Sequence, residues 1–335
     1  MLIHNNERFI VNNEFARDVE RGLDDKQKYI SPKFFYDKKG SRLFEEICKQ
    51  PEYYLNRTES QILKNSVDRI LEIIGNKEIS LVELGNGNSL KTRILLEPML
   101  TRLKNVSYFP IDVSLKMLKK SISDLFSEYA NLKIYGVCSD YVTGLVKINE
   151  FMKSKKNVPK RKFIIFLGSS IGNFDPKEAQ IFLCSIARYV KKCDLLLIGI
   201  DLEKEKSILD RAYNDKNGVT AKFNLNVLSR INKELDGEFK VSNFEHESFY
   251  NTDKHRIEMH LISKIDQQVR IRAIGKTFHF KKGETIHTEN SYKYSLSRLE
   301  KLVGNSGLQV VRNFVDPNKQ YTLILLKKIL NTTKS

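Results

Sequence analysis

The sequence predicts an α/β fold built on a parallel, doubly wound sheet. From Ser80 onward, apolar segments typical of strands alternate with segments of helical spacing, and the strands are expected near 80–85, 107–112, 133–138, 162–167 and 194–200. This alternation favours one sheet with helices on both faces, because parallel strands need a crossover helix between them. The alternation breaks after residue 203, which indicates an inserted second region.

The first predicted strand runs into a glycine-containing turn, LVELGNGNSLK at 81–91. Gly85 and Gly87 permit turn conformations and let a ligand approach the main chain, and the helix start behind them offers free N–H groups. A Gly-x-Gly turn alone occurs in many strand-to-helix loops. A dinucleotide fingerprint would need a third glycine near position 90, where Leu90 stands, so the sequence disfavours NAD.

Acidic residues end the next two predicted strands. Asp112 follows the apolar segment that begins at Tyr108, and Asp140 with Tyr141 ends the segment that begins at Ile134. A carboxylate in this position can accept hydrogen bonds from ribose hydroxyls, and an acid beside an aromatic ring suits adenine. The three strand ends together favour a nucleoside ligand without a pyrophosphate, and S-adenosylmethionine is such a ligand.

Length and composition indicate a large folded enzyme or binding protein. The 335 residues are 41% apolar, enough for one large domain or two interleaved domains. No segment approaches the ~18 consecutive apolar residues of a membrane span, and the N-terminus lacks the pattern of a signal peptide. We therefore expect a cytoplasmic protein without a membrane partner.

Cysteine and histidine spacing argues against a metal site. The four cysteines are scattered without a C-x-x-C pair, and the clustered histidines have no metal-ligand spacing. The four cysteines are Cys48, Cys138, Cys184 and Cys193, and the clustered histidines are His246, His255 and His260. Apolar patterns around three of the four cysteines suggest buried free thiols.

The formal charge of +16 raises nucleic acid as a partner. However, lysines are spread along the chain, and the one dense run, 155–162, lies in an expected loop. We therefore expect no nucleic-acid partner, and we also expect a monomer. A binding module for RNA or an acidic protein is the alternative from another class.

The regions outside the sheet have patterns of their own. Residues 1–30 suggest a helical arm with Phe15, Val19 and Leu23 on its apolar side, and the aromatic segments 34–36 and 53–54 suit a pocket lining as well as a core. The insertion predicts helices 206–213 and 220–235 and antiparallel strands 256–265 and 269–280. The sheet then resumes with a helix at 295–307 that Gly307 ends, and strands 308–314 and 320–326, the second antiparallel to the rest.

The chain resembles the histidine-specific, S-adenosylmethionine-dependent methyltransferases of ergothioneine biosynthesis, which trimethylate the α-amino group of histidine to hergynine. The likeness extends from about Asp18 to Leu326. It is carried by motifs in order along the chain: Phe35-Tyr36-Asp37, Gly40-Ser41, Leu43-Phe44, Pro51-Glu52-Tyr53-Tyr54, Arg57-Thr58-Glu59, Glu83-Leu84-Gly85, Lys91-Thr92-Arg93, Phe166-Leu167-Gly168-Ser169, Ile171-Gly172-Asn173, Gly218-Val219-Thr220-Ala221, Arg256-Ile257-Glu258-Met259 and Thr288-Glu289.

The resemblance implies two domains. A Rossmann-like class I methyltransferase core would comprise 60–203 plus 293–335, and a second α+β substrate domain, built from the N-terminal arm and the insertion, would comprise 1–59 plus 204–292. The matching cofactor positions are Tyr53, Gly85, Lys91, Asp112, Asp140 and Tyr141. The matching substrate positions are Tyr36, Phe44, Asn173, Tyr213, Met259, Glu289 and Ser291.

The resemblance also implies roles. Tyr36 would be the catalytic residue that orients the amino group, Asn173 and Tyr213 would hold the carboxylate, and Glu289 with Met259 would read the side chain. This sequence departs from the family at Asn86 and Asn88, where small residues are usual. Relatives act on tryptophan-type substrates, so another aromatic amino acid is the alternative substrate.

Overall fold

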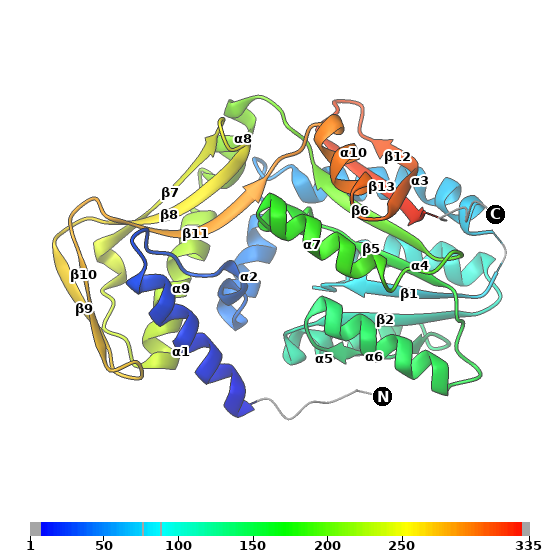
Figure 1. Ribbon diagram of the computed structural model, residues 1–335, viewed down its shortest axis with the longest axis horizontal. Coiled ribbons are helices and arrows are strands. Elements are labelled where there is room, and N and C mark those ends of the chain that lie inside the picture. Colours follow the sequence, from blue (N-terminus) through cyan, green and yellow to red (C-terminus); the bar gives the residue numbers. More distant parts are fainter. Residues whose placement is uncertain (1–7, 76, 88, 330–335) are drawn as a thin grey trace, which may run out of the picture. The chain divides into compact units, whose positions relative to one another are not determined.

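The computed structural model describes residues 8–75, 77–87 and 89–329, so the first part of the predicted N-terminal arm lies outside the described residues. The chain divides into two compact units (Figure 1). Within the described residues, unit 1 comprises Leu55–Glu203 and 294–329, and unit 2 comprises 8–54 and Lys204–Lys293. The first boundary precedes the predicted 59/60 because helix α3 begins at Leu55 and stays whole in unit 1.

Unit 1 is built on an eight-stranded sheet with the order β12-β13-β6-β5-β1-β2-β3, in which β4 also pairs with β2. The strands from β1 to β6 run parallel, and β13 lies antiparallel to both β6 and β12. These findings confirm the predicted strands and the antiparallel orientation of the last one. The strands are β1 Ile79–Leu84, β2 Val106–Asp112, β3 Lys133–Ile134, β4 Val137–Cys138, β5 Lys162–Phe166, β6 Leu195–Asp201, β12 Leu308–Val315 and β13 Tyr321–Lys328.

The third predicted strand, 133–138, is interrupted and forms β3 and β4. Gly136 lies in the interruption, and a Cβ atom there would lie 2.4 Å from Cδ1 of Ile122. The main chain therefore passes close to the side chain of Ile122, which would have to move if position 136 carried a larger residue.

Helices cover both faces of this sheet. In Figure 1, α6, α7 and α10 lie in front of the sheet while α3 and α4 lie behind it. Strand residues such as Leu81, Ile164 and Leu197 are fully buried, which places the core of unit 1 around the central strands. The helices are α3 Leu55–Ile74, α4 Leu90–Arg102, α5 Leu115–Glu128, α6 Tyr141–Ser154, α7 Pro176–Ala187, α10 Leu296–Gly304 and the 3₁₀ helix η2 Ser170–Asn173. Helix α10 ends before the predicted residue 307, and Gly307 follows it with a φ of 76°.

Unit 2 combines helices with antiparallel strands. Phe15, Val19 and Leu23 are buried as predicted for the N-terminal arm. The helices are α1 Arg8–Asp24, α2 Lys38–Ile47, α8 Lys206–Tyr213, α9 Val219–Leu235 and the 3₁₀ helices η1 Pro32–Phe35 and η3 Val241–Asn243. The predicted helices 206–213 and 220–235 are confirmed as α8 and α9.

The strands of unit 2 form a three-stranded antiparallel sheet, β11-β8-β7, and a β9–β10 hairpin. The prediction of one strand at 269–280 is wrong, because a turn with Gly275 at φ 73° separates β9 from β10. Strands β7 and β11 were not predicted, since their sequences FEHESFYN and TIHTENSY are largely polar. The bounds are β7 Phe244–Asn251, β8 Arg256–Ser263, β9 Gln267–Ile271, β10 Lys276–Phe280 and β11 Thr285–Tyr292.

Among the helices of the described residues, none has the length and apolar character needed to cross a membrane. The four cysteines are free thiols, and each is at least partly exposed, so the expectation of buried thiols is wrong.

Candidate cofactor and substrate sites

Three predicted cofactor residues meet at the carboxyl edge of β1 and β2 in unit 1. Gly85 has a φ of 79°, and a Cβ atom on it would lie 3.2 Å from the hydroxyl oxygen of Tyr141. The carboxylate of Asp112 accepts hydrogen bonds from the N–H of Ser114 at 2.8 Å and the N–H of Gly87 at 3.4 Å. Burial raises the pKa of Asp112, and these backbone N–H groups oppose the rise. The structure therefore puts Gly85, Asp112 and Tyr141 around one turn.

Asp140 has a structural task at the same edge. Its carboxylate caps helix α6 by accepting a hydrogen bond from the N–H of Thr143 at 3.0 Å. The side chain is exposed, so it remains accessible to a ligand. Its role toward adenine stays a prediction.

Asn86, one of the departures from the family pattern, turns into the protein. Its side chain is buried and donates hydrogen bonds to the hydroxyl oxygens of Ser121, at 2.7 Å, and Ser89, at 3.3 Å. The side chain of Asn86 thus packs against helix α5, which contains Ser121. Position 88, the other departure, lies outside the described residues.

A buried carboxylate that the sequence did not single out, Glu59, connects the cofactor edge with the loop after β5. Its two oxygens each accept a hydrogen bond from the N–H of Gly168 at 2.9 Å, and one also accepts from the hydroxyl of Tyr321 at 2.7 Å. Lys91 forms an ion pair with the same carboxylate. A Cβ atom on Gly199 would clash with Glu59 Oε1, so a larger residue there would displace this carboxylate.

Lys91 was predicted to contact the cofactor. In the structure its ammonium is paired with Glu59, and its role toward the cofactor stays a prediction. Glu59 in turn fixes the loop that leads to η2 and Asn173. Only the Arg57-Thr58-Glu59 motif of the family could have drawn attention to Glu59, because its partners are distant in sequence.

Glu83, at the end of β1, lies beneath the turn. Its carboxylate accepts hydrogen bonds from Thr92 Oγ1, at 2.8 and 2.7 Å, and from the hydroxyl of Tyr108. Burial raises the pKa of Glu83 to about 7. Glu83 therefore supports the turn from inside.

Aromatic side chains form a continuous group in unit 2. Ring centroids are 5.6 Å apart for Tyr36 and Phe44, 6.4 Å for Phe44 and Tyr53, and 6.1 Å for Tyr53 and Tyr213. Phe223 of α9, which was not predicted, contacts both Tyr36 and Phe44. Tyr53 was predicted to bind the cofactor, whereas the structure groups it with predicted substrate residues. Its role toward the cofactor stays a prediction, as does that of Asn173, which lies in unit 1.

A β-bulge in β11 decides which way Glu289 points. His287 pairs with His260 of β8, but Glu289 pairs with Met259, so Thr288 is the extra residue. Without the bulge, Glu289 would lie opposite Glu258, on the same face as His287, because side chains alternate along a strand. The bulge is held by a hydrogen bond from Thr288 Oγ1 to the Met259 carbonyl at 3.0 Å.

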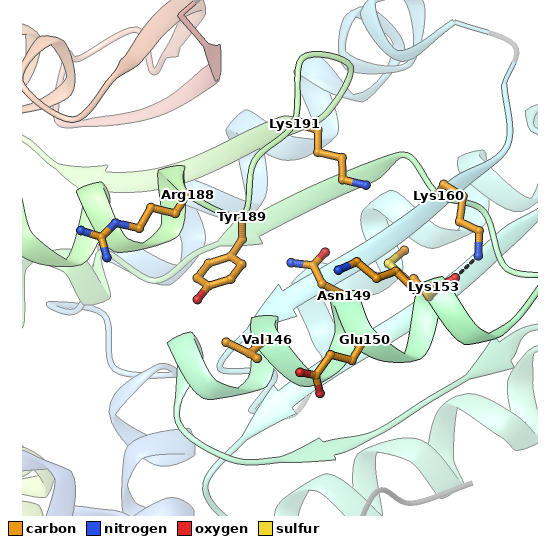
Figure 2. Close-up of a pocket in the computed structure, with 9 residues that line it drawn as sticks. Val146, Asn149, Glu150, Lys153, Lys160, Arg188, Tyr189 and Lys191 are labelled. Carbon is orange, nitrogen blue, oxygen red and sulfur yellow. Dashed lines mark hydrogen bonds between the residues drawn. The ribbon is translucent and has the colours of Figure 1, made fainter.

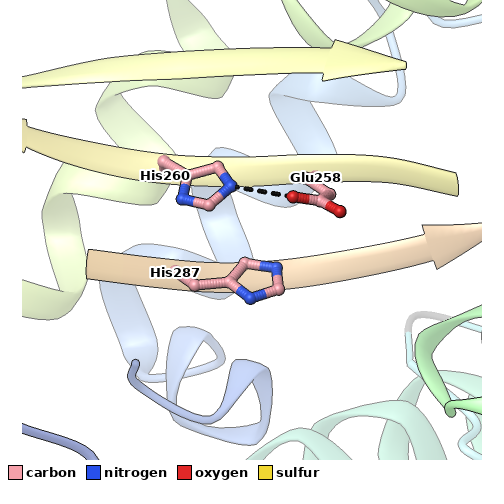
Figure 3. A group of neighbouring side chains, drawn as sticks. All are labelled: Glu258, His260 and His287. Atoms are coloured by element: carbon pink, nitrogen blue, oxygen red, sulfur yellow. Dashed lines mark hydrogen bonds and ion pairs between the residues drawn. The ribbon is translucent and has the colours of Figure 1, made fainter. Parts of the chain in front are cut away.

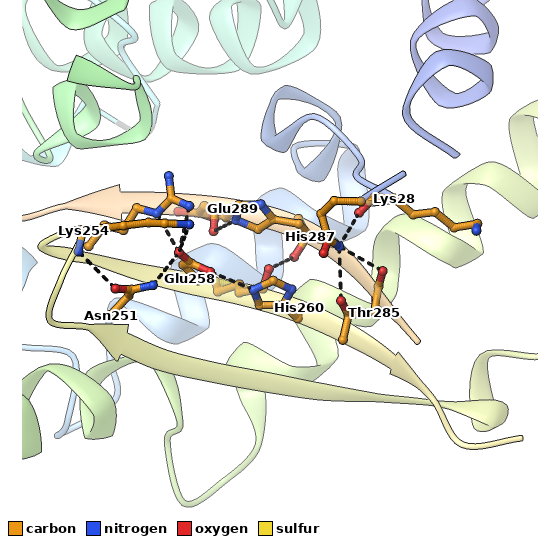
Figure 4. Close-up of polar contacts among 12 residues, drawn as sticks. Lys28, Asn251, Lys254, Glu258, His260, Thr285, His287 and Glu289 are labelled. Carbon is orange, nitrogen blue, oxygen red and sulfur yellow. Dashed lines mark hydrogen bonds and ion pairs between the residues drawn. The ribbon is translucent and has the colours of Figure 1, made fainter. Parts of the chain in front are cut away.

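The edge of β11 at the bulge is also paired. The N–H of His287 donates to the carbonyl of Lys28 at 2.8 Å, and the N–H of Ile30 donates to the carbonyl of His287 at 2.9 Å. Figure 4 shows Lys28, His287 and Glu289 in this region. The segment after helix α1 thus fixes the strand where its register changes.

We call the face of β8 and β11 that carries Met259, Glu289 and Ser291 the substrate face. Helix α8 lies against it, since the hydroxyl of Tyr213 donates to Ser291 Oγ at 2.9 Å. Burial raises the pKa of Glu289 to about 7, while the ammonium of Lys293 acts in the opposite direction. No described residue donates a hydrogen bond to the Glu289 carboxylate, so both oxygens are available to a ligand. The structure therefore brings together four predicted substrate residues.

The opposite face of the sheet carries Glu258, His260 and His287 (Figure 3). The three side chains could supply metal ligands, but the two imidazole rings are stacked, 4.7 Å apart with an interplanar angle of 14°. The lone pairs of imidazole nitrogens lie in the ring plane, so two nearly parallel rings cannot direct them at one ion without rotating. Arg256 already neutralises Glu258, with Nε 2.8 Å from Oε1. The geometry favours an ion-pair network over a metal site.

A surface pocket of about 350 Å³ lies elsewhere in unit 1, between α6 and the end of α7 (Figure 2). None of the predicted site residues lines it. Its basic residues include Lys160, which donates hydrogen bonds to the carbonyls of Met152 and Lys155 at the end of α6. Positive charge is favourable at a helix C-terminus, so a structural role explains this side chain.

Strand order and site define the class of protein. A parallel sheet closed by one antiparallel strand, with a Gly-x-Gly turn after β1 and an acid at the end of β2, is the class I methyltransferase arrangement. The chain belongs to the histidine-specific, S-adenosylmethionine-dependent methyltransferase family, whose model matches residues 15–328.

Named relatives agree with this assignment. The chain is 38% identical to the histidine N-alpha-methyltransferase of Mycolicibacterium smegmatis, over 92% of this chain and 93% of the relative. It is 37% identical to the enzyme of the same name from Mycobacterium tuberculosis, over 93% and 94% of the two chains. It is 30% identical to ergothioneine biosynthesis protein 1 of Schizosaccharomyces pombe, over 92% of this chain and 40% of that longer protein.

Proposed function

We propose that this protein transfers methyl groups from S-adenosylmethionine to the α-amino group of L-histidine and forms hergynine for ergothioneine biosynthesis. The observation that carries the proposal is the position of Glu289. The bulge at Thr288 turns its carboxylate onto the face of Met259 and Ser291, next to Tyr213. Family membership supports the reaction, and this carboxylate supports the substrate.

The carboxyl edge of unit 1 suits the cofactor. Gly85 has no side chain, so a ligand can approach its main chain, and the carboxylate oxygens of Asp112 can accept hydrogen bonds from the ribose hydroxyls. The acids Asp112 and Asp140 also suit the positive charge of a sulfonium compound. When bound, S-adenosylmethionine would supply an electrophilic methyl group.

The residues of unit 2 would hold and orient the amine. An α-amino group has a pKa of about 7.7–8.0 in model peptides, so its deprotonation requires little work and no strong base. Holding the amine in near-attack geometry can contribute roughly 7–11 kcal/mol to the lowering of the barrier. We assign this positioning to Tyr36, which has 39% of its surface exposed at the end of η1.

The aromatic group would also tolerate the product. Each methylation brings the amine closer to a quaternary ammonium, which has a permanent charge and no N–H to donate. The faces of Tyr36, Phe44 and Phe223 can attract such a cation through cation–π interactions. Repeated methylation to the trimethylated product is compatible with this lining.

Glu289 would recognise the imidazole. A carboxylate facing an imidazole N–H forms a charge-assisted hydrogen bond. A phenylalanine side chain would leave the carboxylate desolvated without a partner, which costs several kcal/mol. Tyr213 would support Ser291, to which its hydroxyl donates, and the role of Asn173 toward the substrate carboxylate stays a prediction.

The test is incubation of the purified protein with S-adenosylmethionine and each amino acid separately, followed by product mass measurement. We expect the mass of histidine to increase by three methyl groups and the other amino acids to remain unmodified. Equal or faster methylation of tryptophan would contradict the proposal and favour the alternative substrate.

A further inference from the structure

Lys293 is a fully buried lysine that follows the last residue of β11 on the side of the substrate face. Its Nζ donates hydrogen bonds to Ser291 Oγ at 2.7 Å and to the hydroxyl oxygen of Tyr213 at 3.1 Å. The same atom lies 5.0 Å from the centroid of the Tyr213 ring. The main chain is fixed as well, since the N–H of Lys293 donates to the carbonyl of His255 at 2.8 Å.

These contacts determine which hydrogen atoms the two hydroxyl groups can donate. Both oxygens accept from the ammonium, and the Tyr213 hydroxyl donates to Ser291 Oγ at 2.9 Å. Ser291 Oγ thus accepts two hydrogen bonds, and its own proton must point in another direction. The ammonium therefore converts Ser291 into a donor with a defined direction.

We propose that Lys293 is a positioning residue for the amino-acid substrate: its buried ammonium orients the hydroxyl groups of Tyr213 and Ser291 and places a positive charge on the face that carries Glu289. This inference rests on the proposed function and extends it, because neither the sequence patterns nor the family resemblance pointed to this lysine.

The charge matters because Glu289 must be ionised to bind an imidazole N–H. The ionisable groups near it in unit 2 are Lys293, Tyr213 of α8 and Tyr53 before α3. Burial raises the pKa of Tyr53, so Tyr53 is neutral. His246 contacts the Tyr213 carbonyl. Burial lowers the pKa of His246, so this side chain is not the cation that acts on Glu289. Lys293 is thus the cation that offsets the effect of burial on Glu289.

The experiment compares Lys293→Met, which removes the charge, with Lys293→Arg, which keeps it. Lys254→Met is the matched control, since Lys254 pairs with Glu258 on the other face at 3.6 Å. Calorimetry on the full chain measures the Kd for L-histidine in the presence of S-adenosylhomocysteine between pH 6 and 9, and separately the Kd for S-adenosylhomocysteine.

For Lys293→Met we expect histidine affinity to fall at least tenfold, with unchanged affinity for S-adenosylhomocysteine. Histidine affinity should fall at low pH, where Glu289 becomes protonated, and we call this part of the pH profile the acidic limb. Loss of the nearby positive charge should move this limb upward by about one pH unit. Lys293→Arg should restore most of the affinity, and Lys254→Met should match the unmodified protein. A purely structural role would lower thermal stability without moving the pH limb.

Unchanged histidine affinity and an unchanged pH limb in folded Lys293→Met would overturn the inference. If that variant does not fold, Lys293→Gln decides, because its amide can still donate a hydrogen bond while the charge is lost. An upward shift of the acidic limb with retained S-adenosylhomocysteine affinity then supports the inference, and an unchanged limb overturns it. If the unmodified protein itself does not methylate histidine, the proposed function fails instead.

Discussion

Asp112 is the residue on which we expect cofactor binding to depend most. Asp112→Ala should weaken S-adenosylmethionine binding by roughly 1–3 kcal/mol, because a hydrogen-bonded charged partner of the ribose is removed. Calorimetry measures the effect. Asp124→Ala on the exposed side of α5 is the control and should bind like the unmodified protein. Equal affinity for Asp112→Ala and the control would contradict the assignment.

His287 makes the stability of the fold depend on pH. Burial, with the neighbouring His260, lowers the pKa of His287 to about 4, below its ordinary value of 6.5. The unfolded chain therefore binds the proton first as pH falls, so the stabilising contribution is fully present above pH 6.5 and is lost toward pH 4. The loss should be on the order of 1–3 kcal/mol.

Thermal melting between pH 4 and 7.5 tests this prediction against His287→Gln. The two proteins share their carboxylates, so the contributions of those groups cancel in the comparison. We expect the Tm of the variant to fall less steeply between pH 6.5 and 4. Parallel curves for the two proteins would show that His287 does not titrate in this window.

At the scale of the element, strand β11 is more important than its sequence pattern suggested. Deletion of Thr288 should remove the bulge and make His287 and Glu289 alternate regularly, which leaves Glu289 opposite Met259 on the substrate face. Histidine binding and S-adenosylmethionine binding should therefore both be retained, and calorimetry with each ligand measures the two affinities. Thr288→Val is the control, since it keeps the residue count and removes only the hydrogen bond to Met259. Loss of histidine affinity in a folded deletion variant that still binds S-adenosylmethionine would contradict this pairing of Glu289.

The elements that could be predicted are those with strong apolar patterns. Strands β1, β2, β5 and β6 are mainly apolar, and α8 and α9 have clear helical spacing, so the sequence located them. Strand β11 has polar side chains on both faces, so its sequence lacks the alternation of apolar and polar residues that marks a strand. Its register also depends on the bulge and on pairing with residues 28–30. A pattern within one segment cannot contain such information.

The same reason explains which site residues the sequence indicated. Gly85, Asp112 and Tyr141 stand at strand ends, where the fold itself brings ligands, and the structure places them together. Glu59 and Lys293 were missed because their partners lie far away in sequence or on another element: Tyr321 for Glu59 and Tyr213 for Lys293. The substrate positions came from family resemblance, since pattern alone favoured core or surface roles for them.

At the scale of the whole molecule, the charge of +16 invites a test of polyanion binding. If the lysines form a general solvated surface, binding to duplex DNA or RNA should be weak and should fall steeply with salt, because phosphate contacts release counterions. Fluorescence anisotropy at 50 and 150 mM salt measures this. Sequence-selective nanomolar binding at the higher concentration would instead favour a nucleic-acid-binding function.

We expect recognition of histidine to depend most on a hydrogen bond between Glu289 and the imidazole. The most direct measurement is kcat/KM for L-histidine with Glu289→Gln, which keeps the size of the side chain and removes the charge, together with calorimetric affinity for S-adenosylmethionine. We expect at least a tenfold fall in kcat/KM for histidine, because a charge-assisted hydrogen bond worth about 1.5–3 kcal/mol is weakened, and unchanged cofactor affinity. Intact histidine turnover in this variant would contradict recognition of the imidazole by Glu289.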